Sequence, residues 1–502
     1  MRHQFNILSI GSEMVPYCKT GGLADVLGAL PVELARSGAN VVSVVPYYRQ
    51  VMDWVEKNNV ELEIPPGSLE FFLPGYSGGA SIRKLVDPSG MTVLFIDYPS
   101  AFDRDELYTE SGRDYEDNNL RFSVFSKAAL EAAKLFDFKP DIVHAHDWQA
   151  SMAVVYLKTH YRSDKFFADT KSVLTIHNLG YQGRFPAEKF PSLDLPWDYF
   201  TPDGLEYFGQ VNYLKGGILY ADQVTTVSPT YAKEIQTREF GAGLEGVLKT
   251  RANNLTGILN GVDYEAWNPE SDKLIPTNFS VDDLDGKIEC RRVMLKEMGL
   301  PANAEGPVIG MVTRLAEQKG LDIIASSIKD IAKLNCSLVI LGTGDPVYHD
   351  LLEKAAKKYP ENVAVKLTFS NELAHLIEAG SDIFAMPSKY EPCGLNQMYS
   401  LKYGTVPLVS KTGGLKDTIV NATTTTVKNG KATGFVMNSI SPRSFVTALK
   451  KAVEMYRANP DDWTSLMLNG MKKDFSWNTQ ATAYMSMYKK LSSEVEAATS
   501  AK

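Results

Sequence analysis

The chain has 502 residues, a length that favours two or three domains and can bury a large hydrophobic core. Hydrophobic residues make up 44% of it and charged residues 22%, proportions that exclude disordered and fibrous proteins. The 52 basic and 60 acidic residues give a net charge of -8, which argues against a general binder of nucleic acid or anionic membranes. An anionic substrate would therefore need a local basic cluster.

Short apolar runs alternate with longer amphipathic stretches along the first half of the chain. The first run is too short for the core of a secretory signal, so we predict that it forms the first strand. By the same pattern we predict strands at Phe5–Ile10, Val41–Val45, Met91–Ile96, Asp141–His144, Val173–Ile176, Gln223–Val227 and Leu255–Leu259. The helices predicted between them include Leu120–Phe136 and Trp148–His160.

The second half repeats this alternation. We predict strands at Val308–Val312, Ser337–Leu341, Val363–Leu367, Ile383–Met386, Val406–Val409 and Gly434–Met437. We predict helices at Lys287–Met298, Gly320–Leu334, Val347–Lys358, Glu372–Ala379 and Leu395–Tyr403, and a C-terminal helix with Ala481, Tyr484, Tyr488, Leu491 and Val495 on one face. Such alternation predicts two doubly wound α/β domains with parallel sheets, joined between Asn260 and Pro307. Sheets of this type bind ligands at the carboxyl ends of their strands.

One peptide, Lys-Thr-Gly-Gly-Leu, occurs twice, at Lys19–Leu23 and at Lys411–Leu415. Each copy follows a predicted strand, precedes a helical pattern and has an aspartate two residues later, Asp25 or Asp417. A glycine pair lets backbone N–H groups approach a ligand, and the helix N-terminus and the lysine add positive charge. We predict an anion site, most often for phosphate, at each turn; two turns that only start helices are the alternative.

Polar residues follow several other predicted strands. Arg314 and Lys319 lie at one strand-to-helix turn, where phosphate binding is more probable than a surface role. Gly342-Thr-Gly344 lacks the third glycine of a dinucleotide fingerprint. Cys393 is either a nucleophile or a packing residue at a helix start.

The His144-Ala-His146-Asp147-Trp148 segment also ends a strand, and Thr175-Ile-His177-Asn178 ends another. We expect His144 and His146 to point to opposite faces, so that one faces a ligand and the other is a core histidine. A metal site of these histidines with Asp147 and His177 is the less favoured alternative, because such clusters usually contain more ligands.

The four cysteines, Cys18, Cys290, Cys336 and Cys393, contain no C-x-x-C pair, which fits a reducing cytoplasm rather than a disulfide framework or a zinc knuckle. No stretch approaches the ~20 apolar residues of a membrane span. The signatures of α/β-hydrolases, P-loop NTPases and zincins are missing from the sequence.

Together the motifs resemble those of one family, the bacterial glycogen synthases and plant starch synthases. The segments that carry the resemblance are Lys19-Thr-Gly-Gly-Leu-Ala-Asp25, His144–Trp148, Thr175–Asn178, Leu259-Asn-Gly-Val-Asp263, Arg314-x4-Lys319-Gly320, Glu391-Pro-Cys-Gly-Leu395 and Thr412-Gly-Gly-Leu415. They occur in order over nearly the whole chain, from about residue 5 to residue 490.

The resemblance implies a GT-B glycosyltransferase, in which two Rossmann-like domains face a deep cleft. The implied domains are 1–260 on the acceptor side and 261–475 on the nucleotide-sugar side, with a C-terminal helix at 476–502 that crosses back to the first. The implied reaction moves glucose from ADP-glucose to the non-reducing end of an α-1,4-glucan with retention of configuration. ADP-glucose is a co-substrate, and no cofactor and no metal are implied. We expect a cytoplasmic, bacterial-type enzyme whose partners are these two substrates, with no nucleic acid and no membrane.

The resemblance also implies roles for single residues. Arg314 and Lys319 would neutralise the departing diphosphate, where electrostatic help is most effective. Glu391 would bind the glucose hydroxyls near the reacting carbon. His177 and Asp147 would complete the catalytic set by binding the sugar and by orienting hydroxyls. The substrate-binding residues implied are Lys19, Gly21, Gly22, Asp25, Asn178, Asn260, Cys393, Gly394, Leu395, Thr412, Gly413 and Gly414.

Some choices stay open. Front-face return of the acceptor is the expected mechanism, and double displacement with Glu391 as nucleophile is its rival. UDP-glucose as donor, a sucrose-synthase-like acceptor, an inactive glucan-binding scaffold and a metal-dependent hydrolase are the alternative functions. Asn396 replaces a frequent Thr, Tyr390 a common Phe, and Lys416 a small or apolar residue, which leaves the donor and chain-length preferences undecided.

Overall fold

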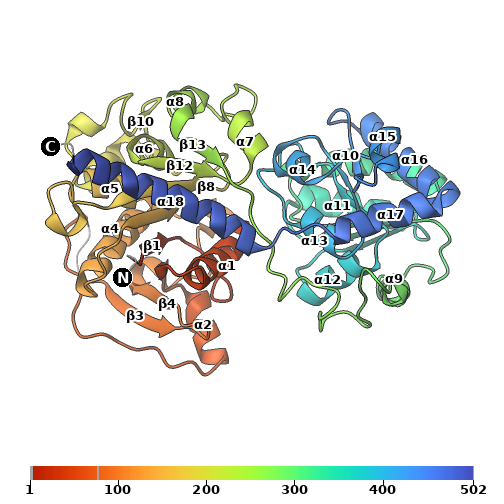
Figure 1. Cartoon of the computed structure of the whole chain (residues 1–502), viewed down its shortest axis with the longest axis horizontal. Coiled ribbons are helices and arrows are strands. Elements are labelled where there is room, and N and C mark those ends of the chain that lie inside the picture. Colours follow the sequence, from red (N-terminus) through yellow and green to blue (C-terminus); the bar gives the residue numbers. More distant parts are fainter. Residues whose placement is uncertain (1–3, 76–78, 501–502) are drawn as a thin grey trace. The chain divides into compact units, whose positions relative to one another are not determined.

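The computed structural model describes residues 4–75 and 79–500, and the chain divides into two compact units. Unit 1 combines residues 1–261 with 477–502, and unit 2 comprises residues 262–476. Both are α/β units built on a predominantly parallel sheet, as the alternation of apolar runs and amphipathic stretches predicts (Figure 1).

The sheet of unit 1 has eight strands in the order β13-β12-β8-β7-β1-β2-β4-β3. Neighbouring strands are parallel except β3, which pairs antiparallel with β4 at one edge. The strands are β1 (Asn6–Ile10), β2 (Asn40–Pro46), β3 (Ser81–Val86), β4 (Thr92–Asp97), β7 (Ile142–His146), β8 (Lys171–Ile176), β12 (Gln223–Thr226) and β13 (Leu255–Gly257). All the strands predicted for this half are therefore confirmed. The antiparallel edge strand β3 was not predicted.

Helices surround this sheet. They are α1 (Gly22–Arg36), α2 (Arg49–Lys57), α3 (Pro99–Phe102), α4 (Asn118–Leu135), α5 (Asp147–Lys158), α6 (Tyr213–Tyr220), α7 (Pro229–Glu234) and α8 (Glu245–Thr250), with short 3-10 turns at Lys165–Phe167, Ala187–Leu193, Trp197–Tyr199 and Ala252–Asn254. Two small antiparallel sheets occupy the long connections, β5 (Thr109–Glu110) with β6 (Arg113–Asp114), and β9 (Arg184–Pro186) with β10 (Glu206–Tyr207) and β11 (Gln210–Asn212).

The last helix, α18 (Trp477–Ser500), belongs to unit 1, where it packs beside α1 (Figure 1). Its inner face buries Ala481, Tyr484, Tyr488 and Leu491 against core residues such as Leu30. The predicted apolar face is thus confirmed for these four residues, and the side chain of Val495 lies outside the described ones. The chain therefore leaves unit 1 once and returns to it at its end.

The sheet of unit 2 has six parallel strands in the order β16-β15-β14-β17-β18-β19. They are β14 (Val308–Val312), β15 (Ser337–Leu341), β16 (Val363–Lys366), β17 (Ile383–Met386), β18 (Val406–Val409) and β19 (Phe435–Val436). The helices are α9 (Asp285–Glu297), α10 (Leu321–Lys333), α11 (Pro346–Lys358), α12 (Asn371–Gly380), α13 (Asn396–Lys402), α14 (Gly413–Thr418), α15 (Thr424–Lys428), α16 (Pro442–Ala458) and α17 (Pro460–Met471), with a 3-10 turn, η5, at Glu317–Lys319.

Side chains of β15 alternate between two separate hydrophobic clusters. Leu338 and Ile340 pack in the cluster that contains residues of α10, α16 and α17, whereas Val339 and Leu341 pack in the cluster that contains residues of α9, α12 and α13. This two-residue period means that both faces of the sheet are covered by helices, which is why its strands are almost entirely apolar.

Candidate active site

In each unit, two adjacent strands run into connections that leave in opposite directions. In unit 1 these strands are β1 and β7, and in unit 2 they are β14 and β17. Such a switch point leaves a crevice outside the carboxyl ends of the two strands, where doubly wound sheets bind ligands. Most of the predicted site residues lie in the loops that follow these four strands or their neighbours.

The centre of the unit 2 cluster is an ion pair between Lys319 and Glu391. The Lys319 Nζ donates to both carboxylate oxygens of Glu391, at 3.0 and 2.8 Å. Ser388 Oγ also donates to Glu391 Oε2, at 2.9 Å, and all three side chains are largely buried. Lys319 follows β14 and Glu391 follows β17, so the switch point brings together the two charged residues that the sequence placed far apart.

The two loops that carry this pair are joined along their backbones. Lys389 N donates to Gln318 O at 2.8 Å, and Gln318 Nε2 donates to Tyr390 O at 3.1 Å. Gly320 has a left-handed backbone, φ +69°, and a Cβ at this position would come within 2.1 Å of the Pro387 carbonyl oxygen. Only glycine permits this approach, so the Lys319-Gly320 dipeptide positions the lysine against the Glu391 loop.

Arg314 lies in the same loop as Lys319, directly after β14. Its side chain is exposed, and within residues 4–75 and 79–500 its guanidinium has no hydrogen-bond partner. Asn396, one of the three residues that depart from the family pattern, donates from Nδ2 to Val312 O at 3.0 Å. The substitution thus gives a structural bond to the end of β14 rather than a change in the charged cluster.

The second glycine turn packs against the Glu391 loop. The Gly414 N–H donates to the carbonyls of Glu391 and Pro392, both at 3.2 Å. A Cβ on Gly413, φ +43°, would lie 1.8 Å from the Glu391 carbonyl oxygen. The expectation that the Gly413-Gly414 amides both face a phosphate therefore needs correction for Gly414. Its amide is used inside the protein, and the glycine pair is required because two backbones touch there.

The Cys393–Leu395 segment links Glu391 to α13. Cys393 and Thr412 are buried, whereas Gly394 and Leu395 are half-buried. Gln397 Nε2 donates to the carbonyls of Cys393 and Gly394, each at 3.0 Å, and so holds this segment from within the helix. Cys393 is 4% exposed, a burial typical of a packing residue rather than of an accessible nucleophile.

In unit 1, the first glycine turn surrounds a carboxylate of the protein itself. Glu13, which is 4% exposed, accepts hydrogen bonds from Thr20 N at 2.6 Å, Thr20 Oγ1 at 2.7 Å and Gly21 N at 2.9 Å. Tyr108 OH donates a fourth, at 2.8 Å. The turn is therefore an anion-binding structure as predicted, but the anion on the Gly21 amide is Glu13, and the expectation that this amide faces a ligand is corrected.

Sequence reasoning missed Glu13. The signal available was a carboxylate eight residues before a glycine turn, directly after the first strand. The lysine of the same turn also has an internal partner, since Lys19 Nζ donates to Asp25 Oδ1 at 2.6 Å and Oδ2 at 2.9 Å. The Lys19 side chain is 44% exposed, so this pair is open to solvent and to competing anions.

Asp147 begins α5 at the end of β7 with a left-handed backbone, φ +56°. Its Oδ1 accepts a hydrogen bond from His177 N at 2.7 Å, which connects the ends of β7 and β8. Burial raises the pKa of Asp147 to about 7, the backbone N–H groups of His177 and Asn178 act in the opposite direction, and the negative Glu13 raises it further. A strained backbone and a perturbed carboxyl group together are typical of a functional site.

His144 and His146 lie on the same face of β7, with ring centroids 4.0 Å apart. The expectation of opposite faces is wrong, because residues two positions apart in a strand share a face. Both nitrogens of His144 have partners, Thr175 Oγ1 at 2.6 Å and Tyr488 OH at 2.8 Å. His144 is therefore the core histidine, and it connects α18 to the sheet.

His146 and His177 form a hydrogen-bonded pair, with Nδ1 and Nε2 3.0 Å apart. Burial lowers the pKa of His177 to about 3 and that of His146 well below its usual value. Both rings are thus neutral at physiological pH and act as hydrogen-bonding groups rather than charges. Within the described residues, no cluster of three or more His, Cys, Asp or Glu side chains is arranged to hold a metal ion.

Two predicted asparagines complete the unit 1 cluster. Asn178 is half-buried, and its Oδ1 accepts a hydrogen bond from Gly180 N at 3.0 Å. Asn260 is 5% exposed, and its Oδ1 has no hydrogen-bond partner among the described residues. A buried amide oxygen without a partner is costly, so it marks a position where a ligand or a water could donate.

Across residues 4–75 and 79–500, none of the helices has the combination of length and apolar character that crossing a bilayer requires.

Comparison with known proteins identifies both halves of the chain. The family described as "Starch synthase catalytic domain" matches residues 6–250, and "Glycosyl transferases group 1" matches residues 297–464. A glycogen synthase of Koribacter versatilis is 46% identical over 97% of this chain and 98% of its own length. A glycogen synthase of Syntrophotalea carbinolica is 44% identical, with the same coverage of 97% and 98%.

A solved structure agrees with these relatives. The catalytic domain of starch synthase IV from Arabidopsis thaliana, bound to ADP and acarbose, has a TM-score of 0.89 and 33% identity, and covers 98% of this chain and 100% of its own. The two doubly wound units are therefore those of a GT-B glycosyltransferase. The chain belongs to the glycogen synthase and starch synthase family of glycosyltransferases.

Proposed function

We propose that this enzyme transfers glucose from ADP-glucose to the non-reducing end of an α-1,4-glucan with retention of configuration. The observation that carries the proposal is the largely buried Lys319–Glu391 pair at the unit 2 switch point, with an exposed arginine, Arg314, in the same loop as Lys319. This arrangement offers cations for a diphosphate and a carboxylate for a sugar. Glycogen synthase relatives and the starch synthase IV complex with ADP and acarbose support the same reaction.

Arg314 and Lys319 would hold the diphosphate of the donor. As the bond between the glucose C1 and the phosphate oxygen breaks, negative charge grows on the leaving ADP, and the two cations stabilise that charge. Lys319 would exchange part of its bonding with Glu391 for bonds to phosphate. Glu391 would then bind hydroxyl groups of the glucose and stabilise positive charge near C1. Cys393, Gly394, Leu395, Thr412 and Gly413 would form the surrounding walls.

Unit 1 would supply further hydrogen-bonding groups for sugars. His177 and Asn178 would bind hydroxyls of glucose, and Asp147 would orient donor or acceptor hydroxyls. Lys19 and Asp25 would contribute at the rim of the first glycine turn. No cofactor takes part in this scheme, because ADP is a good leaving group and the glucose is already activated for transfer.

Retention would proceed by front-face return. The acceptor hydroxyl oxygen bonds to C1 on the face from which ADP departs, and its proton passes to a phosphate oxygen of the leaving group. Double displacement on Glu391 is less favoured because both of its carboxylate oxygens already accept from Lys319, and one of them also accepts from Ser388. Trapping of a glycosyl ester on Glu391 would overturn front-face return.

The experiment is incubation of the full chain with radiolabelled ADP-glucose or UDP-glucose plus glycogen, followed by measurement of label in the polymer and of its linkage. We expect α-linked label mainly from ADP-glucose. Preferred incorporation from UDP-glucose would replace the donor in the proposal. Binding of glycogen without incorporation from either donor would identify an inactive glucan-binding scaffold instead.

The setting that we propose is the cytoplasm, with ADP-glucose and an α-1,4-glucan as the partners. Its support is that the four cysteines are buried and not joined in disulfides, which suits a reducing compartment. Detection of the protein with an antibody in separated cell fractions would test the location.

A further inference from the structure

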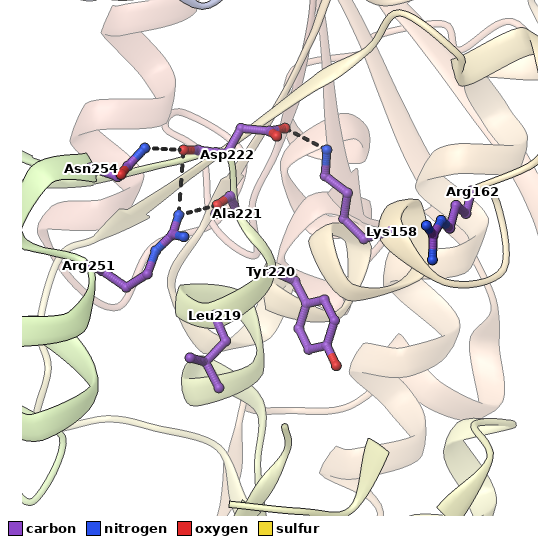
Figure 2. A pocket seen from close by; sticks show the side chains of 8 residues that line it. All are labelled: Lys158, Arg162, Leu219, Tyr220, Ala221, Asp222, Arg251 and Asn254. Carbon is purple, nitrogen blue, oxygen red and sulfur yellow. Dashed lines mark hydrogen bonds and ion pairs between the residues drawn. The ribbon is translucent and has the colours of Figure 1, made fainter. Parts of the chain in front are cut away.

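Unit 1 has an open hollow at the edge of its sheet opposite to the candidate active site (Figure 2). Asp222 precedes β12, and its partner Ser172 lies near the start of β8, so the hollow is at the amino ends of these strands, whereas His177 and Asn178 follow the carboxyl end of β8. Its volume is about 520 Å³, and its lining includes Lys158, Arg162, Tyr220, Asp222, Arg251 and Asn254.

The hollow carries a positive charge on a protein that is negative overall. Three cations, Lys158, Arg162 and Arg251, line it together with one carboxylate, Asp222, which leaves two positive charges against a net charge of -8 for the chain. Oδ2 of Asp222 accepts from Lys158 Nζ at 2.6 Å, Ser172 N at 2.7 Å and Ser172 Oγ at 2.9 Å. Within the described residues, neither arginine side chain bonds to this carboxylate, and Arg251 reaches only the backbone carbonyl of Asp222.

Arg251 has unused donors. Within the described residues its Nη2 donates to two backbone carbonyls, those of Ala221 and Asp222. Its Nε is buried and has no hydrogen-bond partner in the part of the chain that the structure describes. Burial lowers the pKa of Arg251, and the negative charge of Asp222 acts in the opposite direction. A buried guanidinium N–H without an acceptor calls for an explanation, and a bound anion is one.

The remaining lining groups suit a small polar molecule attached to that anion. Figure 2 shows the Tyr220 side chain between Arg251 and Asn254 on one side and Lys158 and Arg162 on the other. The tyrosine ring is half-buried and offers a face and a hydroxyl group. Arg162 is exposed and, within residues 4–75 and 79–500, its guanidinium has no partner.

We propose that this hollow binds a small phosphorylated ligand, with Arg251 and Arg162 as the cations that recognise the phosphate. A phosphate monoester carries close to two negative charges at neutral pH, which equals the excess of positive charge in the hollow. Guanidinium groups match phosphate oxygens in geometry and form charge-assisted hydrogen bonds to them. The site goes beyond the glucosyl transfer proposed above and shares no residue with it.

The test is isothermal titration calorimetry of the full chain with inorganic phosphate and, separately, with glucose 6-phosphate. The chain that is titrated carries Arg314→Ala and Lys319→Ala, so that the cations of the donor site cannot hold the phosphate. We expect one remaining binding event that Arg162→Ala and Arg251→Gln each weaken by about tenfold or more, because each variant removes charged hydrogen bonds. Tighter binding of glucose 6-phosphate than of inorganic phosphate would indicate that the ligand is a phosphate ester. Equal binding of the two would indicate that the ligand is the free phosphate ion.

Two controls make the result specific. Arg238→Ala removes another exposed arginine of unit 1 and should bind both probes as the wild type does. The chain with Arg314 and Lys319 intact should show the same event, together with any binding at the donor site. Arg162 is exposed, so its variant remains informative if Arg251→Gln unfolds. Absence of binding to the chain that lacks Arg314 and Lys319, or unchanged affinity in Arg162→Ala and a folded Arg251→Gln, would overturn the proposal.

Discussion

Lys319 and Glu391 are 72 positions apart in the sequence, yet the Lys319 Nζ lies 3.0 and 2.8 Å from the two carboxylate oxygens of Glu391. A lysine that is paired in this way is partly neutralised before any substrate arrives. Binding of a diphosphate must therefore compete with Glu391 for the same ammonium group. Replacing each residue in turn distinguishes what the lysine contributes from what the glutamate contributes.

Replacing Lys319 by alanine should lower kcat by roughly 10²-fold or more, since a single donor to a developing negative charge contributes about that much. Initial rates of glucose incorporation into glycogen measure the effect. Lys389→Ala is the matched control, because Lys389 lies in the same loop pair but its ammonium group pairs with the exposed Glu317 and Asp322 instead of Glu391. Turnover of Lys319→Ala at the wild-type rate would refute the role of the lysine.

Replacing Glu391 by glutamine should separate ADP binding from turnover. The variant keeps the shape of the side chain but removes the charge that holds Lys319, so we expect ADP to bind at least as tightly as to the wild type. Turnover should fall by roughly 10²-fold, because the group that stabilises charge on the sugar is gone. Calorimetry with ADP and initial rates give the two numbers, and clearly weaker ADP binding would contradict the competition.

Removal of the Glu13 carboxylate should destabilise the first glycine turn. Glu13→Gln leaves a buried amide opposite the N–H groups of Thr20 and Gly21, and we expect the free energy of unfolding to fall by about 3 kcal/mol. Tyr108→Phe removes one donor to Glu13 and should cost about 1 kcal/mol. Urea unfolding of the two variants measures the difference, and equal losses would show that the glycine turn does not depend on the carboxylate.

The pH dependence of stability should reveal the titration of the Asp147 carboxyl group. Its pKa in the folded protein is raised from 3.8 to about 7, so its contribution to stability is fully present below pH ~4 and is lost as the pH rises through 7. Asp147→Asn cannot ionise, tolerates the left-handed backbone and retains an oxygen for His177 N. Relative to the wild type, the variant should therefore gain stability between pH ~4 and ~8, by up to about 4 kcal/mol.

Thermal unfolding across this pH range measures that gain. Asp147→Ala is the comparison, because it also removes the titration but loses the hydrogen bond to His177 N and strains the backbone. A difference between wild type and Asp147→Asn that stays constant with pH would show that the carboxyl group titrates normally.

A last pair of variants tests how the Lys319 loop is positioned. Gly320 and Gly430 have similar backbones, φ +69° and +64°, but a Cβ on Gly320 meets the Pro387 carbonyl at 2.1 Å, whereas nothing lies within 4 Å of one on Gly430. Gly430→Ala should cost only the backbone strain, about 1 kcal/mol. Gly320→Ala should cost clearly more and should also lower kcat. Equal thermal stability and activity of the two variants would contradict the close approach.

Much of the fold follows from the sequence because strands and helices of this type have local patterns. The apolar runs at Ile383–Met386 and Val406–Val409 coincide with β17 and β18, and the alternation of strands and helices indicates the doubly wound class. The positions of Arg314, Lys319 and Glu391 after strands were also readable, since polar residues follow each run directly. The edge strand β3 was not predicted, because its half-exposed pattern is weak.

Partners between distant residues were decided only by the tertiary structure. The duplicated Lys-Thr-Gly-Gly-Leu peptide indicated an anion at each turn, yet the first turn binds the Glu13 carboxylate and the second packs on the backbone of Glu391. From the sequence alone His144 could be a ligand-binding residue. In the structure its Nδ1 is hydrogen-bonded to the hydroxyl group of Tyr488, which lies 344 positions later in the chain. A sequence pattern reports the period of a segment, whereas the acceptor for a given N–H depends on which strands become neighbours, and that is determined by the packing of the whole unit.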